Sequence, residues 1–142
     1  NLDRRLRDSI REETIAILDN PGPLRRRVHE LGRCDDQEMA GLLAGARAVL
    51  MPSFVEGFGL PVVEALEQGV PVIASDLPVF REIAGDIPTY LGADEPSAWV
   101  EAILDYQAEG LERRRQLTAM GRFRAPQWRD HFARVENFLR AL

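Results

Sequence analysis

The fold prediction rests on one stretch, Ser53-Phe54-Val55-Glu56-Gly57-Phe58-Gly59-Leu60-Pro61-Val62-Val63-Glu64-Ala65-Leu66. An apolar run, Ala48-Val49-Leu50-Met51, precedes it, and a helical pattern that ends at Gly69 follows it. This order predicts a strand, a glycine-containing loop and a helix. Glycines let the backbone approach a ligand closely, and the unpaired N–H groups of a helix N-terminus favour an anion such as phosphate. Pro61 suits the first helical position, where its missing N–H costs nothing.

A simpler interpretation of the same residues stays open. Gly57 and Gly59 could serve only a tight turn, and Glu64, in the first helical turn, could only complement the helix dipole. The two glycines are also not a dinucleotide-binding fingerprint, because the third glycine position of that motif is occupied by Val62.

Composition indicates an ordinary soluble globular domain. The chain has 142 residues, of which 45% are hydrophobic and 29% charged, which suffices for one core. The net charge of −5 argues against general nucleic-acid binding, which needs a basic surface. No apolar run approaches the roughly 18 residues of a membrane span, and no signal peptide is visible. We therefore expect a cytoplasmic protein.

The inventory of reactive side chains excludes several chemistries. Cys34 is the single cysteine, so no internal disulfide can form, which fits a reducing compartment. His29 and His131 lie far apart without a second ligand at helical spacing, so no metal site is predicted. All 18 basic residues are arginine, which excludes a lysine Schiff base and a P-loop lysine.

Strands and helices are expected to alternate along most of the chain. The expected strands are 28–31, 48–51, 70–74 and 89–91, and the expected helices are 3–19, a helix starting at 35, 61–68, one from 75 to 85, one starting at 97, 111–120 and 127–142. Residues 14–18 could instead form a short strand. The alternation predicts an α/β fold, a Rossmann-like parallel sheet flanked by helices on both faces. Ligands of such folds bind beyond the carboxyl ends of the strands, where the loop 53–60 would lie.

Several side chains receive structural predictions. An apolar stripe of Met39, Leu42, Leu43 and Ala46 is assigned to the core. Ser97 is expected to cap a helix whose buried side carries Trp99, Val100, Ile103 and Leu104. The clusters Arg25-Arg26-Arg27 and Arg113-Arg114-Arg115 are interpreted as solvated.

The central stretch resembles the signature of a known family. Pro52-Ser53, Glu56 to Pro61, Glu64-Ala65 and Gly69 to Ser75 occur in the order typical of group 1 retaining glycosyltransferases. The match is to their C-terminal, nucleotide-sugar-binding domain within the GT-B fold. Leu31-Gly32-Arg33 upstream and the segment 80–86 downstream extend the resemblance from about residue 27 to residue 92.

The resemblance implies a role for each matching residue. Glu56 would accept hydrogen bonds from hydroxyls of the donor sugar, and Glu64 would hold the ribose hydroxyls. A carboxylate suits a diol because it only accepts hydrogen bonds and has two oxygens. The donor sugar and the diphosphate would face the backbone amides of Gly57, Phe58, Gly59 and Leu60. The base would lie beside the main chain of Gly32, Arg33 and Cys34. The family needs no bound metal, so no cofactor is expected, and the donor would be a UDP-sugar or a GDP-sugar.

The resemblance also implies that residues 1–142 are a donor domain truncated at its N-terminus. The first strands, a diphosphate-binding Arg/Lys pair and the acceptor-binding N-terminal domain would be absent. The parent protein would then be a retaining hexosyltransferase of polysaccharide or glycolipid synthesis, such as a mannosyltransferase, while this piece alone would have no turnover.

Two alternatives stay open: a non-catalytic, degenerate transferase module used for binding or assembly, and another GT-B-like enzyme such as a sugar-nucleotide epimerase. Contact with the inner face of a membrane is expected only through the absent parts. Self-association is expected through the amphipathic helix that starts at Gln127.

Overall fold

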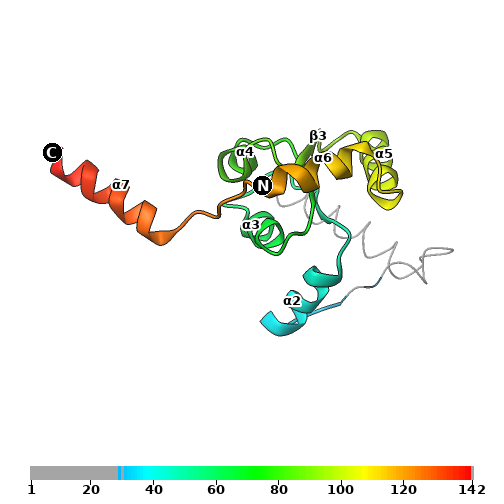
Figure 1. The fold of residues 1–142 in the computed structure, drawn as a ribbon, viewed down its shortest axis with the longest axis horizontal. Coiled ribbons are helices and arrows are strands. Elements are labelled where there is room, and N and C mark those ends of the chain that lie inside the picture. Colours follow the sequence, from blue (N-terminus) through cyan, green and yellow to red (C-terminus); the bar gives the residue numbers. More distant parts are fainter. Residues whose placement is uncertain (1–28, 30, 142) are drawn as a thin grey trace, which may run out of the picture. The chain divides into compact units, whose positions relative to one another are not determined.

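The structure, a computed structural model, describes residue 29 and residues 31–141 (Figure 1). The predicted helix 3–19 and the arginine cluster 25–27 lie outside the described residues. The chain divides into two compact units, Asn1–Asp36 and Gln37–Leu142.

The second unit contains a three-stranded parallel sheet. Its strands are β1 (Val49–Met51), β2 (Val72–Ser75) and β3 (Thr89–Leu91), in the spatial order β1-β2-β3. Leu50 pairs with Ile73, and Ala74 pairs with Tyr90. The three strands expected in this part of the chain are therefore present and parallel, as the alternating pattern predicted.

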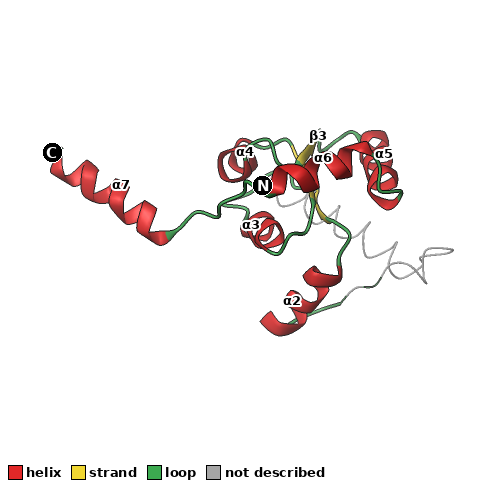
Figure 2. Cartoon of the chain, in the orientation of Figure 1, coloured by secondary structure: helices red, strands yellow, loops and turns green. Residues whose placement is uncertain are grey.

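Figure 2 shows the helices in red, and they precede, connect and follow the three strands along the chain. They are α2 (Asp36–Gly45), α3 (Leu60–Glu67), α4 (Pro78–Ala84), α5 (Pro96–Gln107), α6 (Leu111–Met120) and α7 (Trp128–Arg140). Within the part of the chain that the structure describes, none of these helices has the length and apolar character needed to cross a bilayer.

The central strand β2 is buried on both faces, which explains its continuous apolar sequence. On one face, Val72 and Ala74 belong to a cluster completed by α3 and α4. On the other face, Ile73 packs with the α5 residues Trp99, Ala102 and Tyr106. Helices therefore cover both faces of the sheet, which confirms a Rossmann-like α/β fold.

The helices α3, α4 and α5 all begin with proline in their first two positions, at Pro61, Pro78 and Pro96. Proline is preorganised for helical φ and loses no hydrogen bond there. This arrangement corrects one prediction: Ser97 does not cap α5. Glu95 occupies the N-cap position, because the helix already begins at Pro96.

The buried face of α5 also differs from the predicted one. Trp99 is buried as expected, but Val100 and Leu104 are 56% and 55% exposed and Ile103 is 40% exposed. Ala102 and Tyr106 take their place against the sheet, because they follow Trp99 at the helical spacing of three and seven residues. The prediction gave weight to large aliphatic side chains and overlooked alanine and tyrosine.

The apolar stripe of α2 is only partly in the core. Leu43 and Ala46 pack against the main cluster, whereas Met39 and Leu42 are each 44% exposed. The prediction that all four are core residues is wrong for these two. The reason is the position of β1, which is the edge strand of the sheet within the described residues, so no further described strand lies beside it for α2 to cover.

The expected strand 28–31 is absent at its two described residues. His29 and Leu31 have no strand structure, and residues 28 and 30 lie outside the described residues. A strand needs a paired neighbour to satisfy its backbone groups, and the described ladder begins only at β1.

Candidate functional site

The loop Pro52–Gly59 leads from the end of β1 into α3. Because the three strands are parallel, their carboxyl ends lie at the same edge of the sheet. The N-termini of α3, α4 and α5 follow those ends in sequence. The loop therefore lies at the sheet edge at which an α/β fold binds its ligands, as the sequence predicted.

Gly59 has a structural role in this loop. It is the N-cap residue of α3 with φ of 83°, a left-handed conformation that strongly favours glycine. A Cβ at this position would lie 2.8 Å from a ring carbon of Phe80 and 3.1 Å from Ile83. The tight-turn interpretation thus accounts for Gly59. Gly57 is different, because a Cβ there would point into open space and its φ is not positive.

The backbone amides between these residues form a group of donors. The Gly57 N–H donates to its neighbour Glu56 at 3.1 Å. Among the residues that the structure describes, the N–H groups of Phe58, Gly59 and Leu60 have no acceptor. Pro61 has no N–H, and the next donor, Val62, already bonds to the Gly59 carbonyl. Three consecutive unpaired donors at a helix N-terminus form an arrangement suited to an anion.

The two glutamates differ in their surroundings. Glu56 is half-buried in the loop, and Glu64 is exposed on α3. Since α3 begins at Leu60, Glu64 is its fifth residue and lies beyond the first turn, so the first turn of α3 contains no acidic residue. The interpretation of Glu64 as a first-turn dipole partner is therefore wrong. Its carboxylate has no ion-pair partner within the described part of the chain and is open to a ligand.

Gly32, Arg33 and Cys34 lie in the connection before α2, within the unit Asn1–Asp36. Gly32 and Arg33 are exposed and Cys34 is half-buried. Gly32 has φ of 65°. Their role beside the base stays a prediction.

The cation of Arg81, on α4, is already bound to other residues of the fold. The Arg81 guanidinium donates to both carboxylate oxygens of Asp76, at 2.5 and 2.9 Å, and lies 4.4 Å above the centre of the Tyr90 ring. This hydrogen bonding holds the pKa of Asp76 below its usual range. The Tyr90 hydroxyl in turn donates to the carbonyl of Phe80, the residue that packs on Gly59. Tyr90 thus bonds to the backbone of the residue whose ring packs on Gly59.

The sequence reasoning missed a buried polar network centred on Gln116. Gln116 is fully buried, and its amide donates to the carbonyls of Val72 and Ile87 at 2.7 and 3.0 Å. Its oxygen accepts from the Val72 N–H at 3.0 Å and from the Tyr106 hydroxyl at 2.8 Å. These bonds link the start of β2 to the chain before β3, since the pairing register of the two strands begins only at Ile73 and Thr89.

One signal could have revealed Gln116. It falls in an otherwise partly buried stripe with Ala119, Met120 and Phe123, at the spacing of one helix face. A lone glutamine in such a stripe indicates a buried amide that needs partners.

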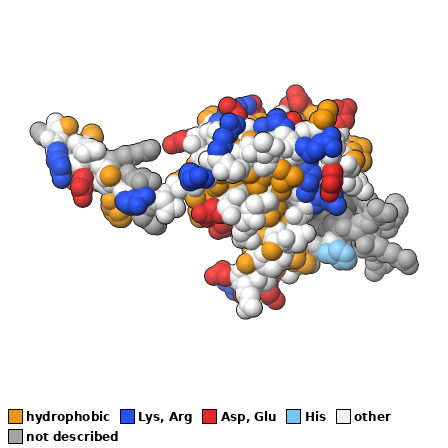
Figure 3. All heavy atoms as spheres, viewed as in Figure 1, with side chains coloured by type: hydrophobic (Ala, Val, Ile, Leu, Met, Phe, Trp, Pro, Cys, Tyr) orange, Lys and Arg blue, Asp and Glu red, His pale blue; other side chains and the backbone are white. Residues whose placement is uncertain are grey.

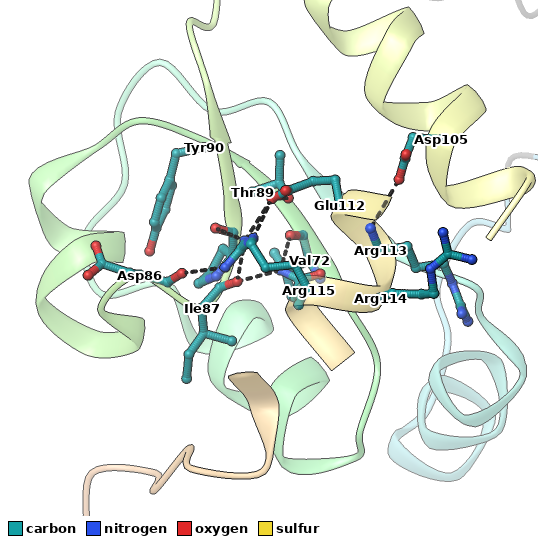
Figure 4. Close-up of polar contacts among 12 residues, drawn as sticks. Val72, Asp86, Ile87, Thr89, Tyr90, Asp105, Glu112, Arg113, Arg114 and Arg115 are labelled. Carbon is teal, nitrogen blue, oxygen red and sulfur yellow. Dashed lines mark hydrogen bonds and ion pairs between the residues drawn. The ribbon is translucent and has the colours of Figure 1, made fainter. Parts of the chain in front are cut away.

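Arg115 extends the same network to the connection between α4 and β3. Its guanidinium bonds to Glu112 at 2.8 Å and donates to the carbonyls of Asp86 and Ile87, each at 3.1 Å (Figure 4). The prediction of a purely solvated arginine face is therefore wrong for Arg115, although Arg114 is exposed as expected. Arg115 also holds the pKa of Glu112 below its usual range.

A hollow of about 850 Å³ lies elsewhere, between the C-terminal ends of α3 and α6. It is lined by residues such as Leu66, Leu117 and Phe123. It is not the candidate site, because α3 begins at the loop and this hollow lies at its other end. The loop with its unpaired amides therefore remains the candidate site.

Together these features define a Rossmann-like α/β domain with a glycine-containing loop at its strand ends. Comparison with known proteins gives the family, since residues 22–123 match the family model "Glycosyl transferases group 1". This chain belongs to the group 1 glycosyl transferases.

Several relatives are named mannosyltransferases. The chain is 38% identical over 85 residues to the serotype-specific mannosyltransferase WbdA of Escherichia coli, an alignment of 60% of this chain and 10% of that protein. It is 32% identical over 120 residues to the MMP alpha-(1->4)-mannosyltransferase of Mycolicibacterium hassiacum, covering 74% of this chain and 29% of that protein. For the O-antigen chain mannosyltransferase RfbU of Salmonella typhimurium, identity is 38% over 80 residues, 56% of this chain and 23% of that protein. The chain thus spans less than a third of each of these relatives.

Proposed function

We propose that this chain is the donor-binding part of a glycosyltransferase and holds the diphosphate of a nucleotide-sugar. The observation that carries the proposal is the run of three unpaired amides, Phe58, Gly59 and Leu60, at the N-terminus of α3. Such donors stabilise a phosphate group without a lysine, which this sequence lacks. Arg81 is bound to Asp76, so the backbone is the better candidate for the anion.

The two glutamates complete the proposed site. Glu64, exposed on α3, accepts hydrogen bonds from the ribose hydroxyls, and Glu56 positions the hydroxyls of the donor sugar. Gly57 lies between Glu56 and the amides and leaves open space above the backbone for the sugar.

In the whole protein, we propose transfer of a hexose from a UDP-sugar or GDP-sugar to a glycan or lipid-linked acceptor, with retention of configuration. Mannose is the proposed hexose, because the relatives named above are mannosyltransferases. Catalysis would consist of positioning the donor and stabilising the departing diphosphate at the helix N-terminus. This chain alone would bind the nucleotide without turnover, because the acceptor site belongs to another domain.

Calorimetric titration of the 142-residue chain with UDP and with GDP tests the proposal. We expect one nucleotide to bind, and Glu64→Ala to weaken that binding about tenfold or more, because a hydrogen bond to a charged group contributes about 1.5–3 kcal/mol. Glu67→Ala is the matched control. Glu67 is also an exposed carboxylate on α3, three residues further along, and its removal should leave the affinity unchanged.

Two results would contradict the proposal. Equal affinity of wild type and Glu64→Ala would remove the ribose role of Glu64. Absence of binding by both this chain and the full-length parent protein would leave the non-catalytic module as the better description.

A further inference from the structure

A fixed ion pair begins at the end of β2, at the same sheet edge as the candidate loop. Strands β1 and β2 are parallel neighbours, so the connections that follow them, residues 52–59 and 76–77, leave the sheet at one edge. Gly59, the last residue of the first connection, lies against Phe80 of α4. Asp76, the first residue after β2, therefore belongs to the edge at which an α/β fold binds its ligands.

The Asp76 carboxylate is held in one orientation. Its oxygens accept hydrogen bonds from Nε and Nη2 of Arg81, at 2.5 and 2.9 Å. Its backbone N–H donates to the Leu91 carbonyl at 2.8 Å, which ties the residue to β3. The Arg81 guanidinium is stacked on the Tyr90 ring, whose hydroxyl donates to the Phe80 carbonyl. Carboxylate and guanidinium are thus preorganised, so a ligand that binds them pays little for ordering them.

Both side chains stay open to solvent despite this bonding. The side chain of Asp76 is 49% exposed and that of Arg81 is 46% exposed. Figure 3 shows acidic and basic side chains side by side on the face of the molecule that it displays. An exposed ion pair contributes little to stability, so this pair is a weak structural element that a ligand can reach.

The unused hydrogen-bonding positions of the pair suit two neighbouring hydroxyl groups. A carboxylate has about four lone-pair positions, of which Arg81 occupies two. Of the five N–H donors of a guanidinium, three have acceptors among the described residues, the third being Asp86 at 3.5 Å. One hydroxyl can therefore donate to the carboxylate while its neighbour accepts from the guanidinium. The hydrogen bonding to Arg81 holds the pKa of Asp76 below its usual range, which keeps the carboxylate an acceptor.

The charge of the pair favours a neutral group over a phosphate. Arg81 and Asp76 cancel each other, and Asp86 adds a negative charge beside them. A diphosphate would gain little there, whereas the unpaired amides of the loop favour it. Sugar hydroxyls are neutral and use a donor and an acceptor together, as this pair offers.

We infer that Asp76 and Arg81 bind two neighbouring hydroxyls of the donor sugar and so take part in selecting that sugar. The inference rests on the proposed function, in which the loop holds the diphosphate to which the sugar is attached. Asp76 accepts from one hydroxyl, and Arg81 donates to the oxygen of the next. An epimer in which one of these hydroxyls points to the other face of the ring cannot make both bonds, and a site that loses such a bond binds less tightly.

Calorimetric titration of the 142-residue chain with a nucleotide and with its nucleotide-sugar tests the inference. The two ligand pairs are GDP with GDP-mannose and UDP with UDP-glucose. For one pair, we expect the sugar to increase the affinity about tenfold or more. Asp76→Asn should remove most of this increase and leave the affinity for the nucleotide unchanged. Arg81→Lys, which keeps the charge but loses the two parallel hydrogen bonds, should also reduce the increase.

Asp86→Asn is the matched control. Asp86 is also a carboxylate on Arg81, but its side chain is 89% exposed and it follows α4, whereas Asp76 precedes that helix. This substitution should leave both affinities unchanged. Glu64→Ala should weaken nucleotide and nucleotide-sugar by the same factor, which separates the ribose contact from the sugar contact. Thermal unfolding of each variant checks that the fold is retained.

Three outcomes would overturn the inference. The first is equal affinity of the wild type for nucleotide and nucleotide-sugar in both ligand pairs. The second is an Asp76→Asn variant that keeps the full increase or that loses both affinities equally. If Glu64→Ala still weakens binding in that case, the donor site stands and only the role of the pair is wrong. The third is a wild type that binds none of the four ligands, which counts against the proposed function as well.

Discussion

Gly59 sets how closely the loop approaches α4. Its left-handed backbone and the 2.8 Å distance from a would-be Cβ to the Phe80 ring act together, so any side chain must displace the aromatic ring or strain the turn. Phe80 is fully buried and cannot move without disturbing the main core cluster.

We predict that Gly59→Ala lowers the free energy of unfolding by about 2 kcal/mol or more, the sum of backbone strain and overpacking. Urea unfolding followed by circular dichroism measures the change. Gly57→Ala is the matched control and should stay within about 0.5 kcal/mol of the wild type, because nothing lies within 4 Å of its Cβ. Equal effects of both substitutions would contradict this account of Gly59.

The buried side-chain amide of Gln116 pairs with several polar groups at once. It bonds to both backbone groups of Val72, to the carbonyl of Ile87 and to the Tyr106 hydroxyl. Gln116→Leu keeps a similar volume but leaves these polar groups unpaired in the core, which costs about 1–3 kcal/mol for each group without a new partner.

We therefore predict a loss of about 3 kcal/mol or more for Gln116→Leu in the same unfolding measurement. Gln107→Leu, at an exposed position of α5, should change stability by less than about 0.5 kcal/mol. A near-neutral Gln116→Leu would show that the surrounding groups find other partners.

At the scale of elements, α6 is attached to the sheet by polar contacts in addition to the apolar contacts of Ala119 and Met120 with the main core cluster. Only Gln116 is fully buried in this helix, and Arg115 reaches the connection between α4 and β3 through two backbone carbonyls. The neighbouring arginines Arg114 and Arg115 therefore differ in their contacts: Arg115 bonds to the backbone of another segment, whereas the Arg114 side chain is exposed to solvent.

Arg115→Ala should destabilise the chain by about 1 kcal/mol, a value reduced because the side chain is 42% exposed. Arg114→Ala should have an effect near zero. Thermal unfolding of both variants at the same ionic strength compares them, and a larger effect at Arg114 would disprove this assignment.

At the scale of the whole molecule, two tyrosines make the free energy of unfolding decrease at alkaline pH. Burial raises the pKa of Tyr90 and of Tyr106 to about 12, whereas an unfolded tyrosine titrates near 10. Both hydroxyls are therefore protonated in the folded state at a pH where the unfolded chain has released the proton. The resulting contribution to the free energy of unfolding is fully present below about pH 10 and is lost as the pH rises towards 12.

We predict that the free energy of unfolding falls between about pH 9 and about pH 11, with about 1 kcal/mol of this loss due to Tyr106. Urea midpoints at the two pH values measure the loss. Tyr106→Phe should lower stability at both values, because the hydroxyl contacts with Thr89 and Gln116 disappear, but should show a smaller loss on raising the pH. An unchanged pH dependence would exclude Tyr106 as its source.

The local patterns of the sequence determined the elements of the sheet unit and the position of the loop. The run Ala48–Met51, the glycines around residues 57–59 and the helix that follows specify strand, loop and helix with little help from distant residues. Gly69, with φ of 76°, ends α3 as predicted. The family signature lies in this same contiguous stretch, which is why the family could be recognised without a structure.

Only the tertiary structure decided which side chains are buried and which polar groups are paired. Tyr106 rather than Leu104 faces the sheet, and Met39 stays exposed because the sheet ends at β1 among the described residues. Backbone carbonyls of distant segments accept hydrogen bonds from Gln116 and Arg115, and the Asp76 carboxylate accepts hydrogen bonds from Arg81. The physical reason is that burial and hydrogen bonding depend on contacts between segments far apart in sequence, which local periodicity does not encode.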